Sequence, residues 1–110
     1  MEENIFRILF DELPDFVFIY EIVNEKLEKF VYANKLTINR LGYNLEELKK
    51  LSPNDIVCID IWSLNMNRIE QVWKTKNEEY INVEIATKVI EYKGKSYGIA
   101  IARDITEKKE

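Results

Sequence analysis

The stretch YINVEIATKVIEYKGKSYGIAIARDI, residues 80–105, decides the fold class. Between residues 81 and 89, apolar side chains alternate with polar ones, which is typical of an antiparallel strand with one buried face. Residues 92–95 form a turn in which Gly94 can adopt positive φ, and residues 97–105 form the next strand. The stretch therefore predicts a hairpin of two long strands.

Shorter strand patterns precede this hairpin. Residues 16–23 are aromatic and β-branched, residues 29–33 form a second strand after a polar turn, and residues 69–73 form an imperfect third. The sequence thus predicts five strands, with helices between the second and the third. Helices on one face of an antiparallel sheet make an α+β domain.

Helix-capping residues mark three short helices between the second and third strands. Asn34 is the N-cap of the first helix, and Gly42 suits a left-handed cap at its end. Asn44 with Glu47 three residues later makes a variant of the capping box for the second. Ser52, followed by proline, begins the third.

The two ends of the chain differ from this central domain. Residues 2–13 predict an amphipathic helix, because apolar side chains recur at spacings of three and four, and Pro14 stops it. We therefore divide the chain into a flanking helix (1–13), a domain (14–106) and a charged end (107–110). That end is either the first turn of an outgoing helix, which begins an output linker, or a solvated tail.

The composition excludes several kinds of site. The 110 residues include no histidine and one cysteine. These counts exclude a Ser-His-Asp or Cys-His mechanism, a histidine-ligated haem and a four-ligand zinc site. The net charge of −4 argues against nucleic-acid binding, and the apolar runs are far shorter than the about 20 residues of a membrane span. We expect a soluble, cytoplasmic protein with no direct membrane contact.

Several motifs follow one another in a characteristic order. YAN (32–34), GY (42–43) and EEL (46–48) resemble the first half of a PAS domain, and YINVE, KGK and ARDITEKK, between residues 80 and 109, resemble its C-terminal PAC motif. The resemblance implies a five-stranded antiparallel sheet in the order 2-1-5-4-3. It also implies a sensor or dimerisation module, not an enzyme, within a larger signalling protein such as a histidine kinase.

The chain departs from the family pattern in two places. The family carries a longer helix beside its ligand cavity, whereas only residues 58–67 are available here. We expect either a helix of about two turns or an irregular loop there. Arg40 occupies a position that is usually apolar in the family. It either neutralises an anionic ligand inside the domain or lies solvated on the helix exterior.

PAS domains bind haem, flavin, small carboxylates or fatty acids, or nothing. Cys58 lacks the Asn-Cys-Arg-Phe context of the light-oxygen-voltage subgroup, so we interpret it as a small buried or half-buried apolar side chain, not as a site of flavin photochemistry or of a chromophore thioester. Ala102 cannot hydrogen-bond a flavin ring. No cofactor is therefore predicted: either an unidentified small molecule occupies the cavity or side chains fill it.

Strand alternation and the resemblance together give the candidate sites. The candidate cavity wall is Phe18, Tyr20, Leu36, Arg40, Ile56, Val83, Ile85, Ala100 and Ala102. Trp62 and Trp73 either pack or stack on a ring ligand. Asp104 and Thr106 resemble the residues that tie the last strand to the outgoing helix. Asp104 can pair with Arg103 or a backbone amide, and Thr106 can cap that helix.

Three alternative functions are consistent with these sequence features. The favoured one is a sensory PAS module that forms a homodimer through the apolar stripe of its first helix and the outer sheet face, and passes a signal to an output domain of the same chain. The second is a protein-interaction module with a filled core. The third is a small enzyme using carboxylates. The stripe is Ile5, Leu9 and Leu13, and the candidate acids are Asp15, Glu21, Asp55 and Asp60.

Overall fold

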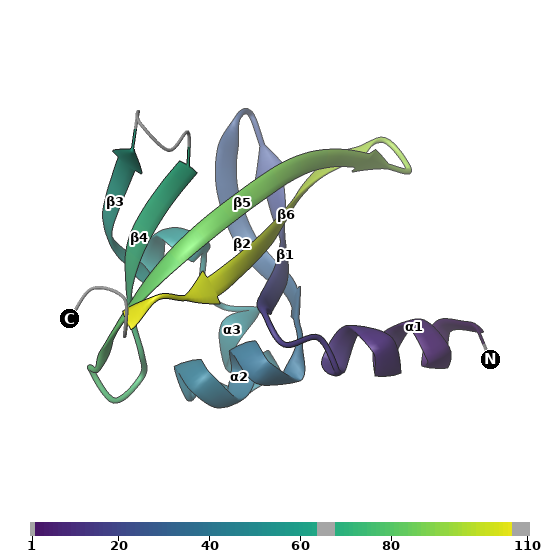
Figure 1. Cartoon of the computed structure of the whole chain (residues 1–110). Coiled ribbons are helices and arrows are strands. Elements are labelled where there is room, and N and C mark those ends of the chain that lie inside the picture. Colours follow the sequence, from purple (N-terminus) through teal and green to yellow (C-terminus); the bar gives the residue numbers. More distant parts are fainter. Residues whose placement is uncertain (1, 64–67, 107–110) are drawn as a thin grey trace.

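The long hairpin is the centre of the fold. In the computed structural model, which describes residues 2–63 and 68–106, β5 covers Tyr80–Tyr92 and β6 covers Lys95–Asp104. Lys93 and Gly94 have positive φ values of 51° and 79° and form the two-residue turn between them. This turn matches the right-handed twist of the strands, so the predicted hairpin and its glycine are confirmed (Figure 1).

Two further hairpins complete one antiparallel sheet. β1 (Phe16–Val23) and β2 (Lys26–Ala33) lie on one side of the central pair, and β3 (Val57–Ser63) and β4 (Arg68–Lys74) lie on the other. The strand order is β2-β1-β6-β5-β4-β3. The sheet therefore has six strands and not five, and without β3 its order is the predicted 2-1-5-4-3.

The additional strand corrects the expectation of a helix or an irregular loop over residues 58–67. β3 pairs antiparallel with β4, with Asp60 opposite Gln71 and Trp62 opposite Ile69. The segment VCIDIW is rich in β-branched and aromatic residues, which favour a strand, and β4 offers a free edge for it to pair with. Residues 64–67 lie outside the described residues.

Short helices cover one face of the sheet, here called the inner face. α2 (Lys35–Leu41), α3 (Leu45–Leu48) and the 3₁₀ helix η1 (Pro53–Asp55) follow β2, while α1 (Glu2–Asp11) projects from the domain (Figure 1). Within the described part of the chain, no helix is long and apolar enough to cross a membrane.

The predicted caps are confirmed. The Asn34 side chain accepts a hydrogen bond from the backbone N–H of Thr37, and Gly42 adopts φ of 85° at the end of α2. Capping boxes form at Asn44 and Ser52, before α3 and η1. In the first box, the Glu47 carboxylate also bonds to Lys76, and this bond together with the Asn44 backbone N–H lowers the Glu47 pKa.

The core lies between the inner face of the sheet and these helices. Trp73 is buried, and its ring lies 5.4 Å from the ring of Phe16 and 5.6 Å from that of Phe18, measured between centroids. Leu41 of α2 and Leu48 of α3 are equally buried. Tilted and edge-on ring pairs of this kind add to the stabilisation that burial alone provides.

Asn34 has a second role that its position as an N-cap does not reveal. Its side chain is buried, and Oδ1 accepts from the backbone N–H of Val17 (3.2 Å) and from the hydroxyl of Thr37 (2.6 Å). Its Nδ2 donates to the carbonyls of Phe10 (3.3 Å) and Asp15 (2.9 Å). One amide therefore joins the end of α1, the start of β1 and the start of α2.

Gly98 on β6 allows an aromatic ring to lie against the strand. A Cβ atom at this position would lie 2.2 Å from Cζ and 2.5 Å from Oη of Tyr20, which is directly opposite Gly98 on β1. These distances are far below van der Waals contact. The missing side chain is thus what allows Tyr20 to pack on the inner face.

Replacing Asn34 with alanine is expected to lower the free energy of unfolding by about 3 kcal/mol, because buried polar groups that lose their partners cost about 1–3 kcal/mol. Asn44→Ala is the matched control, since it removes an N-cap from an exposed helix start, at about 1 kcal/mol. Urea denaturation of both variants measures the difference. Equal losses would contradict the role of Asn34 in joining three segments.

Gly98→Ala is expected to lower stability by about 1–3 kcal/mol, because the added methyl group displaces the Tyr20 ring. Tyr20→Leu removes the atoms that clash with this methyl group, so the double variant should be more stable than the sum of the two single losses predicts. Thermal or urea unfolding of the three variants gives the coupling energy. Simple additivity would show that the ring does not depend on Gly98.

Candidate functional site

A cavity of about 260 Å³ lies against the inner face of the sheet, with η1 at its border. All six strands and η1 contribute side chains to its described wall, and α1, α2 and α3 contribute none. The wall consists of Phe18, Tyr20, Leu27, Pro53, Asn54, Val57, Ile69, Gln71, Ile85, Thr87 and Ala100. Its surface is mainly apolar, and a few uncharged polar groups interrupt it.

Four predicted wall residues lie at this cavity, and five lie elsewhere. Those at the cavity are Phe18, Tyr20, Ile85 and Ala100. Val83, Ala102 and Ile56 are buried in the core, and Leu36 packs against that core. The inner-face alternation is therefore as predicted, but the hollow lies toward one end of that face.

Arg40 lies outside the cavity. It is exposed in the last turn of α2, and its Nη2 lies 3.7 Å from Oδ2 of Asp104 at the end of β6. The guanidinium therefore pairs with the end of the last strand, and Arg40 is not part of the described cavity wall. Its pairing with Asp104 brings together two residues that the sequence suggested for different roles.

Sequence reasoning missed seven of the wall residues. Gln71 and Ile69 share the inner face of β4 with Trp73, and Thr87 follows Ile85 in the alternation of β5, so strand alternation could have identified them. Val57 could not be found in this way, because its segment was not expected to form a strand. The remaining three are Leu27, Pro53 and Asn54.

Tyr20 is a buried polar group in the cavity wall. The residue is 6% exposed, and burial raises the pKa of its hydroxyl above the ordinary value. The phenol therefore stays neutral across the physiological pH range. With it, every side chain of the described cavity wall is uncharged.

Cys58 is exposed, which corrects its interpretation as a buried or half-buried side chain. The pairing of β3 with β4 shifts between Val57 and Ile59, so Cys58 lies in a bulge of an edge strand. A bulge changes the direction of the extra residue's side chain, and an edge strand has no neighbour to cover it.

The other candidates are dispersed. Of the two alternatives for Trp73, packing is the one found, since its side chain is buried in the core. Asp55 belongs to the capping box of η1. The side chains of Trp62 and Asp60 lie outside the described residues. Among the residues that the structure describes, no group of three or more His, Cys, Asp or Glu side chains could hold a metal ion.

The end of β6 forms a compact junction. Oδ1 of Asp104 accepts from the backbone N–H of Thr106 (2.9 Å), and the Thr106 hydroxyl accepts from the N–H of Asn82 on β5 (3.2 Å). Of the two partners suggested for Asp104, the backbone amide is the one found, because Arg103 pairs with Glu84 instead (3.2 Å). The proposed linker, residues 107–110, lies outside the described residues.

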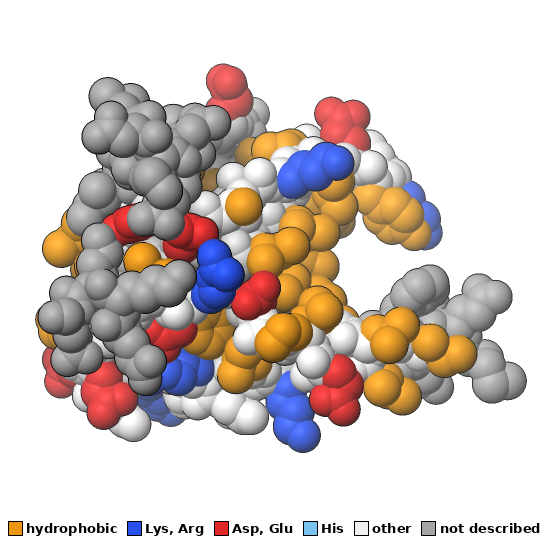
Figure 2. All heavy atoms as spheres, in the orientation of Figure 1, with side chains coloured by type: hydrophobic (Ala, Val, Ile, Leu, Met, Phe, Trp, Pro, Cys, Tyr) orange, Lys and Arg blue, Asp and Glu red, His pale blue; other side chains and the backbone are white. Residues whose placement is uncertain are grey.

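The opposite, outer face of the sheet is apolar beside α1. Ile5 and Leu9 of α1 are 54% and 59% exposed, and Ile90 of β5 and Ile101 of β6 are also exposed. Figure 2 shows hydrophobic side chains gathered over the sheet and again on α1, with a hollow between them. We call these four residues together with Leu13 the outer apolar face.

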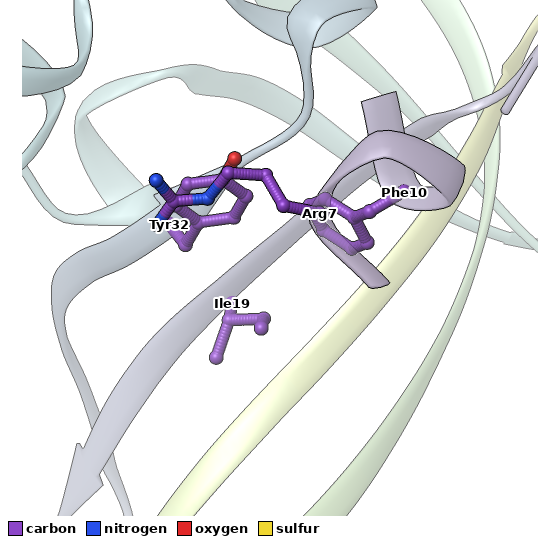
Figure 3. A pocket seen from close by; sticks show the side chains of 4 residues that line it. All are labelled: Arg7, Phe10, Ile19 and Tyr32. Carbon is purple, nitrogen blue, oxygen red and sulfur yellow. The ribbon is translucent and has the colours of Figure 1, made fainter. Parts of the chain in front are cut away.

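α1 touches the sheet through a few side chains. The Phe10 ring lies 5.1 Å from the ring of Tyr32 on β2, and the Arg7 guanidinium lies 5.1 Å from the centroid of the same ring. Together with Ile19 of β1, these residues line an open pocket of about 210 Å³ (Figure 3). The aromatic and cation–π contacts fix the helix at its C-terminal half.

No protein-family model matches the chain. A methyl sulfide methyltransferase-associated sensor of Methanosarcina acetivorans is 29% identical to it over 98% of its length. The chain spans only 12% of that protein.

Solved structures show the same architecture. The PAS domain of an HTR-like protein from Haloarcula marismortui matches 94% of this chain and 92% of its own, with a TM-score of 0.75 and 17% identity. A PAS domain from a two-component sensor histidine kinase matches 94% of this chain and 96% of its own, with a TM-score of 0.75 and 16% identity. The chain therefore has the fold of a PAS domain.

Proposed function

We propose that the chain is the sensory or regulatory module of a larger signalling protein, such as a histidine kinase. The observation that carries the proposal is the course of β6. Ala100 of this strand lines the cavity, and Asp104, four residues later, forms the junction at the strand's end. One strand thus connects the candidate binding site with the place where the chain leaves the domain. The proposal assigns no catalytic step to the chain itself.

The junction is built to respond to a movement of β6. Asp104 is bound on one side to the Thr106 backbone and paired on the other with Arg40 of α2. A ligand that fits one position of β6 better than another would stabilise one of two arrangements of this junction. The segment that follows Thr106 would then carry the difference to an output domain.

The outer apolar face is the proposed homodimer interface. Its α1 residues project from the domain, where they bury little surface within one chain. Two copies that pair through this face would cover apolar surface that a single chain leaves in water, and such burial is favourable by about 25 cal/mol per Å². The face also lies on the side of the sheet opposite to the cavity.

A protein-interaction module with a filled core is the second candidate. The observation that favours it is the aromatic cluster of Phe16, Phe18 and Trp73, which fills much of the inner face with side chains. Native mass spectrometry of the freshly purified chain separates the two functions. A retained small molecule supports the sensory module, and a bare chain that binds a protein partner supports the interaction module.

Leu9→Glu is expected to weaken dimerisation at least about tenfold, because it places a charge in the centre of an apolar interface. Tyr80→Glu is the matched control, since it makes a similar change at an exposed aromatic residue outside the outer apolar face. Sedimentation equilibrium over a range of concentrations measures both. A wild-type chain that stays monomeric at high concentration would exclude the proposed dimer.

Arg40→Gln is expected to raise the amide exchange rate of Thr106 about two- to fivefold, because the pair with Asp104 is partly exposed and contributes about 1 kcal/mol or less. Arg103→Gln is the control, since it breaks an ion pair at the same end of β6 but on the outer face. Hydrogen exchange followed by NMR measures both variants. Equal effects would argue against a specific link from α2 to the junction.

A further inference from the structure

The cavity wall contains a polar group whose orientation is fixed by its neighbour. Gln71 and Trp73 are two residues apart on β4 and therefore share the inner face. The indole Nε1 of Trp73 donates to Oε1 of Gln71 at 2.8 Å. An indole N–H can only donate, so the Gln71 oxygen must face it and the amide NH₂ group must point away from it.

The NH₂ group of Gln71 has unused hydrogen-bonding capacity. Among the residues that the structure describes, nothing accepts a hydrogen bond from Nε2 of Gln71. Gln71 lines the cavity, so a molecule there that carries an acceptor could bind this donor. Gln71 is half-buried, so a ligand that covers this donor without offering an acceptor would leave it unpaired, whereas a ligand acceptor would keep it hydrogen-bonded.

Tyr20 provides a second unused polar group in the same wall. Its hydroxyl has no hydrogen-bond partner within the described part of the chain, although the residue is only 6% exposed. Tyr20 belongs to β1 and Gln71 to β4, so the two residues lie on opposite sides of the central β6–β5 pair. The apolar residues between them, such as Ala100 and Ile85, would contact the body of a bound molecule.

The described part of the wall offers no partner for a charge. None of its described side chains is charged, and Arg40, which could neutralise an anion, is paired with Asp104 outside the cavity. A carboxylate that entered this cavity would lose its water without gaining a counter-charge, which is strongly unfavourable. A neutral molecule would not pay this desolvation penalty.

We propose that the cavity binds a neutral, mainly apolar molecule whose hydrogen-bond acceptor pairs with Nε2 of Gln71. The inference rests on the proposed function, since it takes this cavity to be the sensing site. A volume of about 260 Å³ exceeds the about 150 Å³ that holds benzene in an engineered apolar cavity. The ligand class is therefore a single ring with a short substituent that carries a carbonyl or ether oxygen.

Three probes with one skeleton test the chemistry. Acetophenone has a carbonyl acceptor, α-methylstyrene replaces that oxygen with a methylene group, and benzoate replaces the methyl ketone with a carboxylate. NMR titration of the ¹⁵N-labelled chain follows the side-chain amide of Gln71 and the indole N–H of Trp73. We expect acetophenone to bind about threefold to tenfold more tightly than α-methylstyrene, and benzoate to bind at least about 100-fold more weakly.

Two variants test whether Gln71 causes the preference for acetophenone and whether the probes bind in this cavity. Gln71→Leu keeps a similar volume without the donor, so the ratio of the two affinities should fall to near one while α-methylstyrene still binds. Ala100→Leu fills the cavity and should abolish the binding of every probe. Ala86→Leu makes the same change on the exposed outer face of β5 and should leave binding unchanged.

Several results would overturn the inference. Equal binding of acetophenone and α-methylstyrene, or a preference that survives Gln71→Leu, would remove the role of Gln71 but keep the cavity as a binding site. Benzoate binding as tightly as acetophenone would exclude the selection of neutral molecules. Failure of every probe would refute this ligand class, whereas the sedimentation and exchange measurements on dimerisation and the junction would still decide the proposed function.

Discussion

The structure depends on the hydrogen bonds of one buried amide. Asn34 accepts from Val17 and Thr37 and donates to the carbonyls of Phe10 and Asp15, so it satisfies backbone groups from three segments that meet at the edge of the core. Without it, each of these groups would be buried next to apolar side chains. The direction in which α1 leaves the sheet and the start of β1 are consequently set by the same residue that begins α2.

Local features of the fold could be predicted from the sequence because short-range chemistry determines them. Asn34, Asn44 and Ser52 cap helices whose first turns are only a few residues away, and Gly94 forms a turn that needs positive φ. The alternation along β5 and β6 likewise predicted which side chains lie on the inner face, including Ile85 and Ala100 at the cavity. In each case, the pattern and the structure that it determines lie within one stretch of chain.

The remaining features depend on contacts between distant segments. β3 forms because the edge of β4 is available, and its pairing partner cannot be read from VCIDIW alone. Arg40 meets Asp104 across 64 positions of sequence, so spacing along the chain gives no sign of the pair. The cavity is lined by side chains from strands far apart in the sequence, such as Phe18, Ile69 and Gln71, and binary patterning predicts only which face these residues share.

The strand order has a consequence for how the domain is made. β6 is the last strand in the sequence but lies at the centre of the sheet, where Phe16 of β1 pairs with Ala102. During synthesis, the β1–β2 hairpin and the strands β3 to β5 therefore have unpaired edges until β6 has been synthesised and pairs between β1 and β5. The strand that completes folding is also the one that ends at Asp104, so assembly of the core and formation of the exit from the domain are a single late event.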